Sequence, residues 1–371
     1  MAAAVKLPLE AVEREIARLW EMEARRSGAP RMELMTLVVL VGDPSLVDRA
    51  EKVVAAFVST HPSRTILARW ATGAEAGITA DVALHRLGVG GAACGDAITL
   101  EATGAGRDWL PDNVERLALA DLPICLWWVG DLPDSDRLID RMLGCANVVV
   151  VNSDEMDLRD LHKLSLIVTR SHDRYTLMDL AWVRLRPVQE LIARFFDDEQ
   201  ARACLSALQR ILIEFVPREH ELDVASTQAG LLFGWIATAL RLGVDAVRWQ
   251  KGDAWAEATL GRIVWRFEQH RRTDLPAGTV NRIAFECDGA RFEIERQDDP
   301  FVYRWSRDVP GAAVPAQTLR MPILDEATLL ARSLERPMRD PLFESSLHAG
   351  SRLVRSVAPR LSAPPRGSEE P

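Results

Sequence analysis

The feature that most constrains the fold is the apolar run from Leu122 to Val129, which contains two adjacent tryptophans and is closed by Gly130. An apolar run this short, ended by a glycine, is typical of a strand that is buried on both faces. Successive side chains of a strand point to opposite faces, so Trp127 and Trp128 must enter different packed layers. The run therefore predicts a sheet that is covered on both sides.

The chain around this strand has the order of an α/β protein. A helical pattern at 134–143 follows the strand and precedes a second apolar run at 147–152. The same order occurs earlier, with an apolar run at 34–41, a helical pattern at 46–60 and a strand pattern at 65–70. Strand, helix and strand in succession imply parallel pairing.

Two alternating runs, 78–87 and 97–102, lie between these repeats and are joined by the glycine-rich residues 88–91. Because no helix separates them, they predict an antiparallel hairpin at the side of the sheet. The predicted fold class is α/β, with a Rossmann-like mixed sheet and helices on both faces, over residues 1–170.

The rest of the chain predicts an α+β domain over residues 171–360. Apolar residues recur at helical spacing from 157 to 215 and again from 224 to 242, so both stretches are predicted to be helical. Two closing helices are expected at 326–335 and 343–355.

Between the helical stretches and the closing helices, the period changes from that of a helix to that of a strand. Apolar and polar residues alternate from 263 to 305, and Asp288-Gly289 is a strong hairpin turn. The pattern predicts an antiparallel meander with one buried and one solvated face. Residues 361–371 are predicted to form a disordered tail.

The composition excludes some classes of protein. A net charge of −9 over 371 residues argues against a nucleic-acid partner. No apolar run is long enough to cross a membrane, and the N-terminus lacks the pattern of a secretory signal. None of the five cysteines has C-x-x-C spacing, which favours reduced thiols in a cytoplasmic protein.

No catalytic constellation emerges from the motifs. The glycine-rich stretch 88–95 lies between strands and matches neither G-x-G-x-x-G nor G-x-x-x-x-G-K-[ST]. There is no G-x-S-x-G elbow, and the histidines show no zinc spacing. We therefore predict no catalytic residue, no cofactor and no metal site.

Two places could still bind a small molecule. His61 and Arg64 could hold a sugar phosphate, but they follow a helix whose C-terminal dipole repels anions, so capping of the helix end is the favoured interpretation. Asp131, Asp134 and Asp136 follow a central strand, where open α/β sheets bind ligands. Helix capping by Asp134 explains part of that cluster.

Tryptophans and arginines are the candidate partner-binding residues. Burial accounts for most tryptophans in apolar strands, and an indole that contacts a partner is the alternative. Trp182 and Arg186 are four residues apart and share one helix face. The candidate partner-binding residues are Trp127, Trp128, Asp131, Trp182, Arg184 and Arg186.

Several motifs, in order, resemble the OpcA family of glucose-6-phosphate dehydrogenase assembly proteins. They are Leu37–Val41, Arg64 after His61-Pro62-Ser63, Cys94-Gly95-Asp96 with Ile98-Thr99-Leu100, Asp121–Pro133 with Asn152-Ser153-Asp154, and Asp179–Leu185, with looser agreement at Gly234-Trp235 and Arg241–Gly243.

The resemblance implies a non-catalytic assembly factor and allosteric activator. Such a protein binds oligomeric glucose-6-phosphate dehydrogenase, promotes its active oligomer and controls the oxidative pentose phosphate pathway. The alternative function is a sugar-phosphate-binding enzyme or sensor on a Rossmann-like sheet. The family resemblance carries no active-site residues with it.

Overall fold

The computed structural model describes residues 6–87, 93–132, 136–171, 174–197, 199–218, 224–244, 248–311, 314–335 and 338–361. The chain divides into two compact units. Unit 1 comprises Met1–Glu155, Ser171–Leu180 and Asp325–Arg339, and unit 2 comprises Met156–Arg170, Ala181–Leu324 and Asp340–Pro371.

Both units are discontinuous in sequence, unlike the contiguous domains 1–170 and 171–360 expected from the sequence. A short strand in Ser171–Leu180 returns to unit 1 because it completes the first sheet, and the helix in Asp325–Arg339 returns because it packs on a helix of that unit. Residues 362–371 of the expected tail lie outside the described residues.

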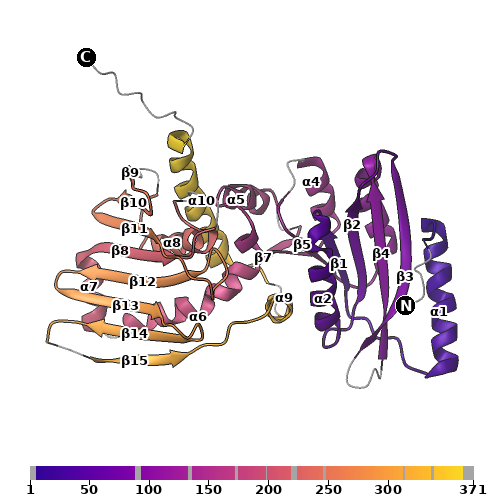
Figure 1. Ribbon diagram of the computed structural model, residues 1–371, viewed down its shortest axis with the longest axis horizontal. Helices are drawn as coiled ribbons and strands as arrows, with labels where there is room; N and C mark the ends of the chain where they lie inside the picture. Colours follow the sequence, from indigo (N-terminus) through magenta and orange to yellow (C-terminus); the bar gives the residue numbers. More distant parts are fainter. Residues whose placement is uncertain are drawn as a thin grey trace, which may run out of the picture. The chain divides into compact units, whose positions relative to one another are not determined.

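Unit 1 is built on a seven-stranded sheet in the order β3-β4-β2-β1-β5-β6-β7 (Figure 1). Neighbouring strands are parallel except β3 and β4. The strands are β1 (Thr36–Val41), β2 (Arg64–Ala71), β3 (Gly77–Leu87), β4 (Ala93–Thr103), β5 (Ile124–Val129), β6 (Val148–Val151) and β7 (Thr176–Asp179).

Helices flank this sheet, as the sequence predicted. They are α1 (Val12–Arg26), α2 (Val47–Val58), α3 (Leu110–Leu117), α4 (Asp136–Gly144) and α9 (Glu326–Leu334), with short 3-10 turns η1 (Leu9–Ala11), η2 (Pro44–Leu46), η4 (Gly104–Trp109) and η5 (Ser153–Glu155). The Rossmann-like mixed sheet is thus confirmed.

The central strands are buried on both faces because their side chains, apart from Thr36, are apolar. All six residues of β1 are buried, and β5 pairs with β1 so that Val39 lies beside Trp127 and Leu40 beside Trp128. The antiparallel hairpin is confirmed by β3 and β4, whose connecting residues 88–92 lie outside the described part of the chain.

Unit 2 is built on an eight-stranded sheet in the order β15-β14-β13-β12-β8-β11-β10-β9 (Figure 1). Its strands are β8 (Leu208–Phe215), β9 (Arg248–Lys251), β10 (Trp255–Leu260), β11 (Ile263–Gln269), β12 (Val280–Cys287), β13 (Ala290–Arg296), β14 (Val302–Asp308) and β15 (Val314–Arg320). Its helices are α5 (Asp160–Arg170), α6 (Leu180–Phe195), α7 (Glu199–Cys204), α8 (Thr227–Ala239) and α10 (Pro341–Leu361), and η6 covers Leu205–Ala207.

The predicted antiparallel meander is present, but the helical prediction for 157–215 is wrong at both β7 and β8. The segment 208–215 is a strand at the centre of the second sheet, antiparallel to β12 and parallel to β11. Leu205, Leu208 and Leu212 suggested a helical period. The alternation of Ile211, Ile213 and Phe215 with more polar residues, which has the strand period of two, determines the fold.

One face of the second sheet is covered by aromatic side chains from helices. Phe233 of α8 meets Trp265 of β11 edge-on, with ring centroids 4.6 Å apart. Phe195 of α6 stacks on Trp305 of β14 at 4.7 Å, and the Trp305 indole donates a hydrogen bond of 3.1 Å to the Leu191 carbonyl. This apolar layer is the core of unit 2.

The helices of unit 2 approach closely because glycines lie at their crossing. A Cβ atom added to Gly234 of α8 would lie 1.9 Å from the Ser346 carbonyl oxygen of α10, and one added to Gly350 would lie 2.7 Å from the Gly230 carbonyl oxygen. These contacts are with backbone atoms, which cannot swing away as a flexible side chain could.

Replacing Gly234 with alanine should therefore destabilise the protein by about 2 kcal/mol or more, since the two helices must move apart. Chemical denaturation of the full chain measures this change. Gly243→Ala is the matched control, because nothing lies within 4 Å of a Cβ atom built there. Equal stability of the two variants would contradict the close crossing.

Candidate functional site

The carboxyl edge of the first sheet is the place where open α/β folds bind ligands. Chain connections run in one direction from β1 to β2 and in the other from β5 to β7, so the order reverses between β1 and β5. Ligands of such sheets bind at this reversal, outside the ends of the strands. The residues that follow β1 and β5 therefore decide what this edge can hold.

After β1, a carboxylate occupies the position that an anion would need. The turn reads Gly42-Asp43-Pro44-Ser45, and the Asp43 side chain accepts a hydrogen bond of 2.9 Å from the Ser45 amide. This hydrogen bond lowers the pKa of Asp43. Pyrophosphate groups bind such helix starts through free amides, and here one amide is already engaged by a negative charge.

Two side chains fill the space at the reversal point. A Cβ atom added to Gly42 would lie 2.2 Å from the Trp70 ring at the end of β2. One added to Gly130, whose φ is +83°, would lie 2.8 Å from Leu46 Cδ1. The indole of Trp70 and the side chain of Leu46 thus cover the backbone that a dinucleotide would approach.

The ends of β6 and β7 add further acidic groups. The amide and hydroxyl of Ser153 donate to the Asp179 carboxylate at 3.0 and 2.7 Å. Arg49 of α2 forms ion pairs with Glu155 of η5 and with Glu326 of α9. These carboxylates raise the pKa of Arg49 despite the desolvation that opposes it, so this guanidinium already has two anionic partners.

The predicted cluster of aspartates lies partly at this edge. Asp131 is exposed, and its carbonyl accepts a hydrogen bond of 3.2 Å from the Trp128 indole. Asp134 lies outside the described residues, as does the side chain of Asp136. Within the described ranges, no three acidic, histidine or cysteine side chains are grouped as a metal site would need.

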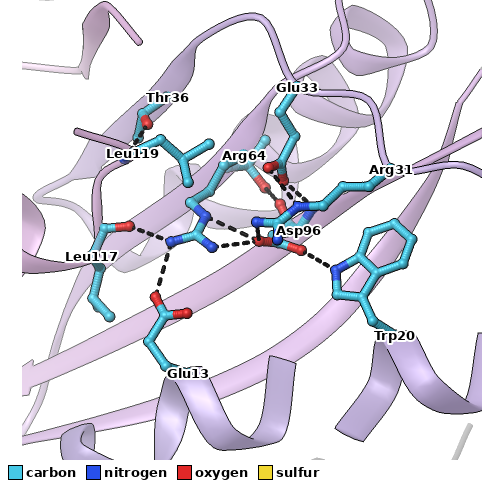
Figure 2. Close-up of polar contacts among 10 residues, drawn as sticks. Glu13, Trp20, Arg31, Glu33, Thr36, Arg64, Asp96, Leu117 and Leu119 are labelled. Atoms are coloured by element: carbon cyan, nitrogen blue, oxygen red, sulfur yellow. Dashed lines mark hydrogen bonds and ion pairs between the residues drawn. The ribbon is translucent and has the colours of Figure 1, made fainter. Parts of the chain in front are cut away.

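A buried ion pair at the opposite end of β2 is the strongest polar feature of unit 1 (Figure 2). Arg64 donates to one oxygen of Asp96 from Nε at 3.0 Å and from Nη2 at 2.6 Å, and Arg31 donates to the same oxygen at 2.6 Å. The Trp20 indole donates to the other oxygen at 2.7 Å. The Asp96 side chain is fully buried and that of Arg64 is 3% exposed.

The network extends on both sides of this pair. Arg64 Nη1 donates to the Leu117 carbonyl at 2.7 Å and to Glu13 at 3.0 Å (Figure 2). Glu33 accepts from the Asp96 amide at 2.9 Å and from Arg31 at 2.8 Å. The network thereby joins α1, the segment 31–33, the start of β2, the start of β4 and the end of α3.

The electrostatics of the network follow from burial and charge. Desolvation lowers the pKa of Arg64, but the Asp96 and Glu13 carboxylates outweigh it and raise that pKa overall. Desolvation and the nearby Asp96 raise the pKa of Glu33, against hydrogen bonds from the Asp96 amide and Arg31. The surface capping of the preceding helix that was favoured for Arg64 from the sequence is wrong, because its guanidinium is buried and donates instead to the Leu117 carbonyl at the end of α3.

Both strand tryptophans are buried. Trp127 and Trp128 are 0% and 1% exposed, so neither indole contacts solvent at the surface of unit 1. The alternation of the strand sends them to opposite layers. Trp127 Nε1 has no hydrogen-bond partner among the described residues. Packing in the core accounts for both indoles, and their role as partner contacts stays a prediction.

The helix-face prediction for α6 is confirmed in its geometry. The Trp182 indole donates to Asp340 Oδ2 at 3.1 Å, and Arg186 Nη2 lies 4.0 Å from the same oxygen. Trp182 also packs against Phe343, with ring centroids 5.5 Å apart, and is buried. Arg186 remains 51% exposed, and Arg184 is half-buried.

The predicted partner-binding residues are divided between the two units. Asp131 belongs to unit 1, whereas Trp182, Arg184 and Arg186 belong to unit 2.

No helix within the described ranges has the length and apolar character needed to cross a bilayer.

The partners of Arg64 were missed from the sequence. Glu13, Trp20, Arg31 and Asp96 are far apart in the chain, and no local period connects them to Arg64. One sequence signal could have pointed to the pair: Arg64 and Asp96 both lie in motifs by which the chain resembles the family.

Comparison with known families gives a consistent result in both halves of the chain. The matching family is described as a glucose-6-phosphate dehydrogenase subunit. Residues 54–165 match its N-terminal domain, and residues 175–347 match its C-terminal domain.

Curated relatives are named OpcA, the name of the family that the sequence motifs resemble. A "Putative OxPP cycle protein OpcA" of Synechococcus elongatus is 26% identical over 270 residues, which are 68% of this chain and 58% of the relative. The protein of the same name from Nostoc punctiforme is 28% identical over 199 residues, 52% of this chain and 41% of the relative. The chain thus spans less than two thirds of each.

Among solved structures, the 3-ketoreductase KijD10 from Actinomadura kijaniata is similar, with a TM-score of 0.49 and 13% sequence identity. The similarity covers 87% of this chain and 96% of that chain.

Replacing Asp96 with asparagine should destabilise the protein by about 3–5 kcal/mol, because Arg64 would keep its charge in a buried place with only the exposed Glu13 carboxylate as a counterion. Urea denaturation measures this change. The double variant Asp96→Leu with Arg64→Met is the control, since it removes both charges and should be more stable than Asp96→Asn. A loss below 1 kcal/mol in Asp96→Asn would contradict the role of the pair.

Proposed function

Because the chain belongs to the OpcA family of glucose-6-phosphate dehydrogenase assembly proteins, we propose that it is a non-catalytic partner of that enzyme. It binds glucose-6-phosphate dehydrogenase and promotes its active oligomer. In this way it controls the flow of carbon into the oxidative pentose phosphate pathway.

The observation that carries this proposal is that both halves of the chain match the two domains of the dehydrogenase-associated family, in the same order. A match to one half alone could reflect a shared fold, which does not imply function. A match across both halves relates the two domains, in their order, to the role of a single family. The relatives named for the oxidative pentose phosphate cycle support the same pathway.

The carboxyl edge of the first sheet supports a role without catalysis. Leu46 and Trp70 cover the backbone there, and Asp43 occupies an anion position. A sugar phosphate or a dinucleotide carries negative charge and requires free amides or cations. The nearby cation Arg49 is paired with two glutamates. The alternative of a sugar-phosphate enzyme or sensor at this edge is therefore disfavoured.

The proposed mechanism is a shift of population. If the protein binds the active oligomer more tightly than the inactive state, mass action raises the active fraction. A tenfold ratio of affinities corresponds to about 1.4 kcal/mol of coupling free energy, within the usual range of allosteric effects. No chemistry on this chain is required.

Within the predicted contact set, Arg186 is the residue best suited to a partner. Its guanidinium is 51% exposed and reaches Asp340 only at 4.0 Å, so a carboxylate of the enzyme could replace that pairing at small cost. Trp182 is buried, and its role is indirect. Its indole donates a hydrogen bond to Asp340 and so positions the carboxylate that Arg186 approaches. Arg184 and the exposed Asp131 remain proposed contacts on their respective units.

The central test mixes the purified protein with glucose-6-phosphate dehydrogenase from the same cell. We expect higher dehydrogenase activity, co-elution of the two proteins, and a change in enzyme mass by light scattering. Heat-denatured protein at the same concentration is the control. The absence of both co-elution and any change in activity at micromolar concentrations would refute the proposal.

A second test addresses the contact residue. Arg186→Glu should weaken binding to the dehydrogenase by about tenfold, because it places a like charge against the carboxylate that Arg186 is proposed to meet. Titration calorimetry or surface plasmon resonance measures the affinity. Arg194→Glu, at an exposed position further along α6, makes the same change of charge as a control. If both variants bind like the unaltered protein, Arg186 is not a contact.

A further inference from the structure

The second face of the eight-stranded sheet carries an ordered pattern of charges. On β8, Arg210, Leu212 and Glu214 alternate with the buried Ile211 and Ile213, so they lie on the face opposite the aromatic core. The neighbouring strands show the same alternation, with apolar residues facing the helices. We call this the outer face.

The strand register places the outer-face residues in three rows across β11, β8, β12 and β13. One row reads Val264, Arg210, Glu286, Arg291; the next reads Arg266, Leu212, Ala284, Glu293; the third reads Glu268, Glu214, Arg282, Glu295. Leu212 is half-buried and Ala284 is fully buried, and charged side chains surround both. The outer face is therefore mainly charged, with Leu212 as its apolar centre.

The rows are self-complementary. A two-fold axis that runs along the strands between β8 and β12 brings β8 of one copy over β12 of another, and β11 over β13. Arg210 then faces Glu286 of the second copy, and Leu212 faces Ala284. In the same operation Arg266 faces Glu293, whereas Glu214, which lies opposite Arg282, is buried and already accepts a hydrogen bond from Asn281.

The next strands out continue the pattern. Trp255 of β10 and Arg304 of β14 share the row of Glu268 and Glu295, so the same axis places an arginine over an indole, a favourable cation–π pair. One like-charged pair, Glu268 with Glu295, opposes the arrangement. Two kinds of opposite-charge contact, Arg210 with Glu286 and Arg266 with Glu293, are each formed twice and outweigh it.

The outer face is also large enough. Its eight strands, about 4.8 Å apart and about six residues long, cover roughly 38 by 20 Å, or about 760 Å². A standard stable interface buries about 800 Å² on each partner. Face-to-face sheet packing at about 10 Å separation is a common arrangement.

We propose that the outer face is a self-association surface, which pairs with the same face of a second copy of the chain about this two-fold axis. Closed two-fold dimers use one surface twice, as the rows require. The charged groups already form ion pairs within one copy, but Arg210 holds Glu257 and Glu286 only at 4.0 and 3.9 Å. That loose geometry lets the guanidinium turn to a carboxylate of the second copy.

The test uses two variants of the full chain that swap charges. The acidic variant carries Arg210→Glu and Arg266→Glu, and the basic variant carries Glu286→Arg and Glu293→Arg. In a dimer of either variant, every contact at these positions becomes like-charged. We expect each variant alone to dissociate at least about a hundredfold more readily than the unaltered protein by sedimentation equilibrium.

An equimolar mixture of the two variants should form dimers again, because each new glutamate of one copy faces a new arginine of the other. The ion pairs within each copy are not restored by mixing, so recovery reports only contacts between copies. Arg25→Glu, on the exposed surface of α1, is the control and should leave the dimer unchanged. Circular dichroism establishes that each variant folds; if one does not, the single variants Arg210→Glu and Glu286→Arg are mixed in the same way.

A monomeric unaltered protein at tens of micromolar would overturn the proposal, as would variants that dimerise alone or fail to recover on mixing. Binding to glucose-6-phosphate dehydrogenase is measured separately, so failure of the dimer leaves the proposed partner role intact.

Discussion

Unit 1 depends on the buried ion pair between Arg64 and Asp96. Removing two charges from water is costly, and attraction offsets that cost only when the hydrogen bonds are complete. Here Asp96 accepts bonds from two arginines and an indole, and Arg64 also donates to a backbone carbonyl. Since these groups come from α1, the 31–33 segment, β2, β4 and α3, the first helix and the edge of the sheet hold their places through one polar centre.

The same unit shows that a Rossmann-like sheet can keep its strand order while side chains cover the edge at which such sheets bind ligands. The strand order keeps its reversal between β1 and β5, yet Trp70 and Leu46 occupy the space and carboxylates line the edge. The fold alone therefore says little about chemistry. The surfaces that we propose for contact with other proteins are the exposed side of α6 and the charged outer face of the second sheet.

Sequence reasoning worked where a single local period decides the structure. The paired tryptophans had to enter two layers, and both are buried. It failed at β8, where leucines at helical spacing overlap with isoleucines at strand spacing, and only pairing with β11 and β12 resolves the conflict. It also failed at Arg64, because burial of a charge depends on partners that are distant in the chain. The position of Arg186 beside Trp182 followed from helix spacing alone.

The discontinuity of the units affects how the protein is made. Helix α9, whose Glu326 pairs with Arg49, belongs to unit 1, although it is translated after all eight strands of the second sheet. During synthesis on the ribosome, unit 1 must therefore wait for this late segment, while chain order normally lets an N-terminal domain fold first. Its α2 surface stays uncovered until then, so the nascent chain passes through a long stage in which the first unit is incomplete.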